Sequence, residues 1–321
     1  MRPRSLTRWC VSLFVAALAA QACAAEQGAV IPLSALAEAD RQALVAGIEQ
    51  ARSEDPGRFG GVRQTLHMLL EIRVRSIVGS DHVTRRVEFG RDDLFSLLEL
   101  IAVRGPERGD LRDGQWLDVQ GWLIGSVGRL RDPRALPVLE AVLRSEEVDP
   151  ALLLGAAAAI ARLESDEAAD LLLSILDDPS EPKARRDAVL RGIGFCGRAR
   201  VALRLADLLA QAPEPETACA IVDSLGQVGN FGLWATQGRP NDEEKVVRTV
   251  AAEAALRAFL AYDEEEVRTR AKGALMLVGD LSMLSLIETQ QRSVTAPEDL
   301  AALEKLKVEC EQFWERSRPA R

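Results

Sequence analysis

A repeat of about 33 residues constrains this chain more than any other feature of its sequence. Copies of one short apolar pattern place five residues at equivalent positions, at Leu130, Leu163, Cys196, Val228 and Val278. The steps between them are 33, 33, 32 and 50 residues, so the last step is one repeat with an insertion of about 17 residues. One helical hairpin cannot bury its own apolar stripe, but stacked hairpins share a continuous core. The period therefore predicts a stack of helical hairpins.

Each repeat divides into two helices. In the second copy apolar residues recur at three- and four-residue steps, at Leu152, Leu153, Ala156, Ala157, Ile160 and Leu163. Ser165 and Asp166 then offer capping oxygens to a second helix over residues 167–176. In the first copy Asp132 is a capping residue and is followed by Pro133, which is favoured at the first helical position. No stretch alternates apolar and polar residues as a strand would, so the chain is predicted to be all-α.

Two segments carry a resemblance to a known repeat. The sequences of residues 131–139 and 266–275 resemble HEAT-like repeats of the phycobilin-lyase type, and the resemblance covers roughly residues 116–290. It implies an all-α, right-handed α-solenoid of stacked HEAT-like helical hairpins with a C-terminal capping helix. It implies no activity, because many unrelated proteins use the repeat. The lyases of that type attach bilins in the cytoplasm, and the leader described below argues against this role, so no lyase residue is transferred.

The expected organisation has four parts. They are a signal peptide over residues 1–24, an irregular helical N-terminal region over 25–115, the repeat solenoid over 116–291 with its insertion at 229–244, and a capping helix and tail over 295–321. In the N-terminal region helices are expected over residues 33–52, 62–78 and 92–103. In the capping helix Leu303, Leu306, Cys310 and Phe313 are expected to share one buried face.

The first residues are typical of a secretory leader. Three arginines within the first eight residues precede an apolar run over residues 9–20, which is shorter than the ~20 residues that span a bilayer. Small residues at Ala20, Ala22 and Ala24 then satisfy the rule for signal-peptide cleavage. This pattern predicts a periplasmic or secreted protein.

Cys23 leaves a second form of export open. It could carry a lipid after bacterial lipoprotein processing, although Ala20 and Leu18 fit that motif only loosely. Plain cleavage near Ala22 or Ala24 is favoured. Contact with a membrane is expected only if Cys23 is lipidated.

The composition argues against several classes of function. With 40 Lys and Arg against 49 Asp and Glu the net charge is −9, which disfavours nucleic-acid binding. Two histidines and five scattered cysteines form no set of metal ligands, so neither a metal nor another cofactor is predicted. His67 lies among apolar residues and is expected to be packed. No catalytic residue is assigned.

Three motifs are interpreted as chance matches. The glycine pattern over residues 192–197 resembles a dinucleotide-binding loop, but it ends a helix that begins near Lys183 instead of following a strand. Ser80, Asp81 and His82 are adjacent on one expected loop, and adjacent residues do not converge as a catalytic triad does. The tripeptide at residues 108–110 matches a cell-adhesion motif, and such short motifs recur by chance.

Acidic residues follow one another in the links between repeats, and the densest group is Asp263, Glu264, Glu265 and Glu266. Equivalent links of stacked repeats lie along one edge, so these residues are candidates for binding a basic partner or for gathering divalent cations. None of the links has the spacing of a calcium-binding hand, so no specific calcium site is predicted. The alternative is local, since carboxylates at a helix N-terminus are stabilised by the helix dipole.

The insertion at 229–244 is the second candidate binding element, because insertions in repeat proteins often form loops on the binding face. It contains Phe231 and Trp234, and tryptophan is enriched at the centres of interfaces. The alternative is that both rings fold back and cover a neighbouring groove.

These observations predict an exported, non-catalytic scaffold that binds an unidentified protein through the concave face of the solenoid and the insertion. An enzyme with its site in the insertion and the N-terminal region is one alternative, and perturbed carboxylates in a pocket would favour it. A structural spacer of the cell envelope is the other.

Overall fold

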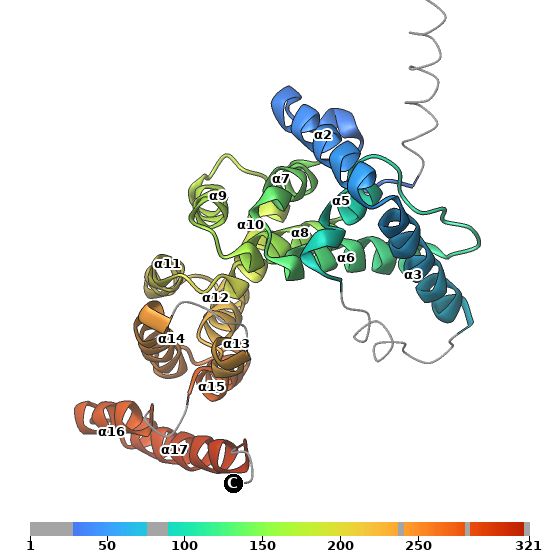
Figure 1. The fold of residues 1–321 in the computed structure, drawn as a ribbon. Helices are drawn as coiled ribbons and strands as arrows, with labels where there is room; N and C mark the ends of the chain where they lie inside the picture. Colours follow the sequence, from blue (N-terminus) through green and yellow to red (C-terminus); the bar gives the residue numbers. More distant parts are fainter. Residues whose placement is uncertain (1–27, 76–88, 237–240, 280–282, 318–321) are drawn as a thin grey trace, which may run out of the picture. The chain divides into compact units, whose positions relative to one another are not determined.

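The computed structural model describes residues 28–75, 89–236, 241–279 and 283–317. Within these ranges every regular element is a helix, and consecutive helices pack as hairpins (Figure 1). The expected all-α fold of stacked hairpins is confirmed. The leader with Cys23 and the segment from Ser80 to His82 lie outside the described residues.

The chain forms two compact units, residues 1–159 and 160–321, and the boundary falls inside one helix. The helices of the first unit are α2 (Glu38–Glu54), α3 (Pro56–Arg75), α5 (Leu94–Ala102), α6 (Asp113–Leu130), α7 (Leu136–Arg144) and the first part of α8 (Pro150–Leu163). Short 3-10 turns precede three of them, at η1 (Leu33–Ala35), η2 (Arg91–Asp93) and η3 (Pro133–Ala135).

Two expected boundaries in this unit are wrong. The helix expected over residues 33–52 is broken at Leu36, whose backbone is extended, so that α2 begins only at Glu38. The helix expected from residue 62 begins earlier, at Pro56, where proline again takes the first helical position.

The core of the first unit is α5. Leu94, Leu97, Leu98 and Ile101 are fully buried, and the helix packs against α2, α3, α6 and α7. Glu99 is buried on the same helix and forms two ion pairs. Its carboxylate lies 2.7 Å from the Arg52 guanidinium and 3.4 Å from that of Arg63. These two ion pairs join α2 and α3 to α5. The N-terminal region is therefore packed around a buried helix, although its sequence carries no clear repeat.

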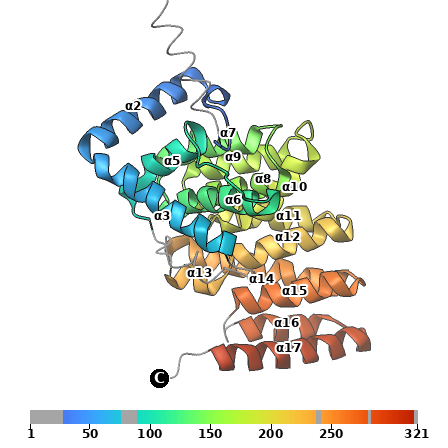
Figure 2. The same cartoon turned by 90° about the vertical axis from the view of Figure 1, so that its right-hand side faces the viewer.

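The helices of the second unit, after the last turn of α8, are α9 (Asp166–Asp177), α10 (Lys183–Gly192), α11 (Ala199–Ala210), α12 (Pro215–Val228), α13 (Phe231–Thr236), α14 (Asn241–Ala261), α15 (Glu265–Val278), α16 (Leu284–Ser293) and α17 (Pro297–Ser317), with η4 (Ile193–Phe195) after α10. The first helices of successive repeats, α10, α12 and α15, pack on one another and form the first-helix layer. The second helices are α9, α11, α14 and α16, and we call them the second-helix layer. In this layer α11 packs on α14 and is joined to α9 by ion pairs. Figure 2 shows α12, α15 and α17 following one another along this unit.

Small residues bring the first helices together. A β-carbon added to Gly128 would meet the Cα of Ala159 at 2.6 Å, and one added to Gly194 would meet the Cα of Ser224 at 2.9 Å. Gly128 and Gly194 each lie two residues before one of the five equivalent repeat positions. Their partners, Ala159 and Ser224, each lie four residues before the equivalent position of the following repeat. The close approach of neighbouring helices thus explains why the pattern recurs every 33 residues.

The predicted caps Asp132 and Ser165 are confirmed, whereas Asp166 is the first residue of α9 and not its cap. The Asp132 side chain accepts a hydrogen bond from the backbone N–H of Arg134, with Pro133 at the first helical position. The Ser165 hydroxyl accepts one from the N–H of Ala168. The glycine pattern over residues 192–197 lies at the end of α10 and in η4, which is the turn of the repeat.

The C-terminal helix α17 packs against α15 and α16. Leu303, Leu306 and Cys310 are buried as expected, but Phe313 is 37% exposed and Trp314 takes the buried position instead. The indole N–H of Trp314 donates to the Met276 carbonyl at 3.1 Å. None of the helices in the described ranges is long and apolar enough to cross a membrane.

Candidate functional site

The acidic residues from Asp263 to Glu266 lie at the start of α15, and all four are exposed. Glu264 is the N-cap residue, and Glu265 and Glu266 lie in the first turn, where the helix dipole stabilises their charge. This local role does not account for the surface beside them. Glu264 and Glu266 also line a groove of about 320 Å³ in the first-helix layer, which we call the acidic groove. Its other lining residues are Arg191, Pro215, Glu216, Cys219, Ala220, Asp223 and Arg270.

Ion pairs cross the acidic groove between neighbouring repeats. The Arg270 guanidinium lies 2.7 Å from the Asp223 carboxylate and 3.5 Å from Glu266. Arg191 lies 3.4 Å from Glu216. The lining contains four carboxylates and only two guanidinium groups. Both arginines are thus already paired with the wall, and the groove remains acidic.

Two groups in the acidic groove have perturbed pKa values. Burial raises the pKa of the Asp223 carboxyl, and Arg270 opposes this shift. Burial also raises the pKa of the Cys219 thiol, and Glu266 adds to that shift. A thiol with a raised pKa is protonated at neutral pH and is a poor nucleophile. A perturbed carboxylate in a pocket is the feature expected of an enzyme, but one Asp223 oxygen is already bonded to Arg270.

The two aromatic residues of the insertion have different environments. Trp234 on α13 is only 4% exposed, and its indole N–H donates to the Val228 carbonyl at 2.9 Å. Phe231 is 49% exposed, and the Arg248 guanidinium lies 5.2 Å from the centre of its ring. Trp234 is therefore packed against the repeats, as the alternative to binding expected, whereas the Phe231 ring is exposed at the surface. Neither residue lines the acidic groove.

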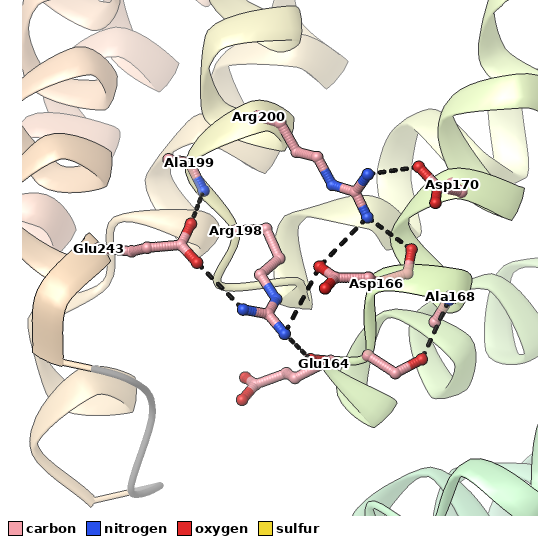
Figure 3. A network of polar contacts seen from close by, with 9 residues as sticks. Glu164, Asp166, Ala168, Asp170, Arg198, Ala199, Arg200 and Glu243 are labelled. Carbon is pink, nitrogen blue, oxygen red and sulfur yellow. Dashed lines mark hydrogen bonds and ion pairs between the residues drawn. The ribbon is translucent and has the colours of Figure 1, made fainter.

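The far end of the insertion is tied into the repeats by a polar network that sequence reasoning missed (Figure 3). Glu243 of α14 accepts hydrogen bonds from the backbone N–H of Ala199 at 2.5 Å and from Arg198 at 3.0 Å. Arg198 also donates to the Glu164 carbonyl at 2.8 Å. The carboxylate therefore caps the N-terminus of α11 from a distance of 44 residues in the sequence.

Arginines of α11 also bind α9. Arg200 donates to the Asp166 carbonyl and pairs with Asp170, and Arg204 lies 2.8 Å from Asp177. The only trace of these pairs in the sequence is that basic residues stand 27 to 34 positions after acidic ones, close to the repeat length. Such spacing is hard to separate from chance in a chain with this many charges.

No group of three or more His, Cys, Asp or Glu side chains in the described part of the chain is placed to hold a metal ion. His67 is not packed as expected. Its side chain is 72% exposed and lies 3.7 Å from Glu71 on the outer face of α3.

Comparison with known families gives one result. The family model of HEAT repeats matches residues 111–190. This segment, about a quarter of the chain, is similar to HEAT repeats. The matched segment covers α6 to α9 and most of α10, and it includes residues 131–139, which carried part of the resemblance. A comparison with curated proteins finds no match.

The acidic groove lies just beyond the matched HEAT repeats, in the copies whose first helices end at or near Cys196, Val228 and Val278. HEAT arrays use extended surfaces formed by successive repeats to bind other proteins. The phycobilin-lyase type, by contrast, stays a prediction, because the match concerns HEAT repeats in general.

Proposed function

We propose that this chain is an exported, non-catalytic HEAT-repeat scaffold that binds a protein partner through the acidic groove. The observation that carries the proposal is the placement of Glu216, Asp223, Glu264 and Glu266 in one groove shared by α12 and α15. The groove is built by stacking of repeats, so its shape is set by the same contacts that hold the solenoid together.

The charge of the groove favours a basic partner. Arg191 and Arg270 are neutralised within the wall, and the excess carboxylates, with exposed Asp263 and Glu265 beside them, complement lysine or arginine side chains. Complementary charges of this kind steer association and set specificity more than they set affinity. We therefore expect binding that weakens as salt concentration rises.

The chemistry of the groove favours binding over catalysis. Asp223 is bonded to Arg270, and the Cys219 thiol is held in its protonated form. A catalytic carboxylate or thiol would need a free, activated oxygen or sulfur facing the substrate.

Export rests on the leader, and its test is independent of the groove. The mature protein recovered from a bacterial envelope or culture medium should begin after Ala22 or Ala24, as measured by intact mass. A mass that retains residues 1–24 would contradict export, and a lipid on Cys23 would make the protein a membrane-anchored lipoprotein.

The binding proposal is tested by photo-crosslinking. A photoreactive phenylalanine analogue is placed at position 264, at the rim of the acidic groove, in the full-length protein expressed in its cell. The crosslinked products are compared between this background and a version that also carries Glu216→Lys and Glu266→Lys. The matched control carries Glu298→Lys and Asp299→Lys, which change the charge equally in the first turn of α17.

We expect one dominant basic protein to be crosslinked in the parent and in the α17 control, and to be lost from the groove variant. Identical products in all three proteins would exclude the acidic groove as the binding surface. Circular dichroism of each variant shows that the helical fold is retained.

A further inference from the structure

A second groove lies in the second-helix layer, between α11 and α14, and has a different character. It measures about 310 Å³. Nearly all of its lining is aliphatic, at Ala206, Leu209, Ala210, Ala212, Ala254, Ala258 and Ala261. Arg257 and Tyr262 complete it. We call it the alanine groove.

The alanine groove exists because small side chains face each other from two neighbouring helices. Ala206 and Ala210 on α11 lie one turn apart, and so do Ala254 and Ala258 on α14. Ala254 and Ala258 are only 1% and 2% exposed, so these residues form the floor of the groove, and its exposed rim is formed by Ala210, Ala212 and Ala261.

The end of the alanine groove is fixed by a hydrogen bond. The Tyr262 hydroxyl donates to the Pro213 carbonyl at 2.8 Å, which joins the C-terminus of α14 to the link after α11. Burial raises the pKa of Tyr262, and Glu264 adds to the shift, so the hydroxyl keeps its proton. The groove is therefore preorganised and does not have to form on binding.

Arg257 is the one charged residue that lines the alanine groove, and it is exposed. Within the described residues its guanidinium has neither an ion pair nor a hydrogen bond, and Glu253 one turn earlier does not pair with it. This differs from the acidic groove, where both arginines are bonded to the wall. A free guanidinium beside an aliphatic groove complements a carboxylate that accompanies an apolar side chain.

We propose that the alanine groove binds a segment of a protein partner that places an aliphatic side chain, such as leucine, next to a carboxylate. The aliphatic side chain lies in the groove formed by α11 and α14, and the carboxylate pairs with Arg257. The proposal goes beyond the function given above, because it concerns the other helix layer and a ligand of opposite charge.

The smallest probes that separate the two contacts are N-acetyl-leucine, which has the side chain and the carboxylate, and N-acetyl-leucinamide, which lacks the charge. Binding is measured on the full-length protein by NMR of ¹³C-labelled alanine methyl groups, several of which line the groove. We expect N-acetyl-leucine to bind with a millimolar Kd and to shift the methyl signals of the groove. The amide should bind about tenfold more weakly, because it loses the charged hydrogen bond.

Two variants test the two contacts separately. Arg257→Gln should weaken N-acetyl-leucine binding about tenfold and leave the amide unchanged. Ala210→Leu with Ala261→Leu, at two exposed rim positions, should fill the groove and abolish binding of both probes. The matched controls are Arg292→Gln on α16 and Ala301→Leu on α17, which are exposed and lie outside the groove.

Equal binding of the two probes, equal binding by wild type and Arg257→Gln, or shifts confined to other methyl groups would each overturn the proposal. The NMR shifts report on α11 and α14, whereas the photo-crosslink reports on the acidic groove at position 264. Each experiment can therefore contradict its own proposal and leave the other proposal unaffected.

Discussion

Gly226 of α12 lies against Ala274 of α15 so closely that a β-carbon on Gly226 would stand 3.0 Å from the Ala274 Cα and 3.1 Å from its Cβ. The same relation joins Gly128 to Ala159 and Gly194 to Ser224. In each case the absence of a side chain lets the end of one first helix, or for Gly194 the turn η4 after it, rest on the backbone of the next first helix. The stacking of the repeats therefore requires glycine, which has no β-carbon, at these three positions.

The first prediction concerns Gly226. Alanine normally stabilises a helix relative to glycine by about 0.5–1 kcal/mol, but at this position the added methyl group must push α12 and α15 apart. We expect Gly226→Ala to lower the free energy of unfolding by about 1–3 kcal/mol, measured by urea denaturation.

The control for Gly226 lies on the helix that it contacts. A β-carbon on Gly273 would meet nothing within 4 Å, so Gly273→Ala should be stabilising by about 0.5–1 kcal/mol. Stabilisation by both substitutions would show that the close approach of α12 and α15 does not limit the stacking.

The repeat could be found from the sequence because one physical requirement recurs in it. Small residues at a fixed position, a cap such as Ser165, and apolar residues at helical spacing all act within about 33 residues, so each leaves a local pattern. The break at Leu36 and the position of Trp314 could not be found in this way. They depend on which of two adjacent residues meets a neighbouring helix, and that is decided by packing between distant segments.

The second prediction concerns the tertiary cap of α11. Glu243→Ala removes the acceptor of the Ala199 N–H and one partner of Arg198, which should cost about 1–2 kcal/mol of stability. Amide hydrogen exchange should be faster in the first turn of α11 in this variant.

The matched control for Glu243 is Glu253→Ala on the same helix. Glu253 is exposed and has no ion pair among the described residues, so its loss should change stability by less than about 0.5 kcal/mol. Equal effects of the two substitutions would mean that Glu243 contributes only its charge and not a cap.

The third prediction concerns pH. The Arg134 side-chain hydrogen bond lowers the pKa of the Asp132 carboxyl below its ordinary value of 3.8. A lowered pKa in the folded state stabilises the fold at pH values above the unfolded pKa, and this stabilisation is lost as the pH falls through the folded pKa.

The substitution Asp132→Asn isolates this charge effect, because asparagine caps a helix about as well as aspartate. Urea denaturation should show wild type more stable than the variant by about 1 kcal/mol at pH 6, with the difference vanishing below the lowered pKa. A difference that stays constant as the pH falls through that pKa would show that the carboxylate charge plays no part.

The candidate sites were only partly predictable for the same reason as the helix boundaries. Glu264 and Glu266 could be named because they follow each other in one link, whereas Asp223 and Arg270 come together only when α12 stacks on α15. The alanine groove left no signal that stands out from the alanines of the core. Whether a methyl group fills a contact or leaves a groove depends on the distance between the helices.

The last prediction separates packing from presentation in the insertion. Trp234 is buried and bonded to the Val228 carbonyl, so Trp234→Ala should lower the free energy of unfolding by about 3–5 kcal/mol. Phe231→Ala exposes little new surface and loses mainly the contact with Arg248, which is worth about 0.5–1 kcal/mol. Urea denaturation of the two variants measures both costs, and the crosslink from position 264 then shows whether Phe231 contributes to binding. A Trp234→Ala protein as stable as wild type would mean that α13 is not anchored by this indole, and Trp234 would return as a candidate for binding a partner.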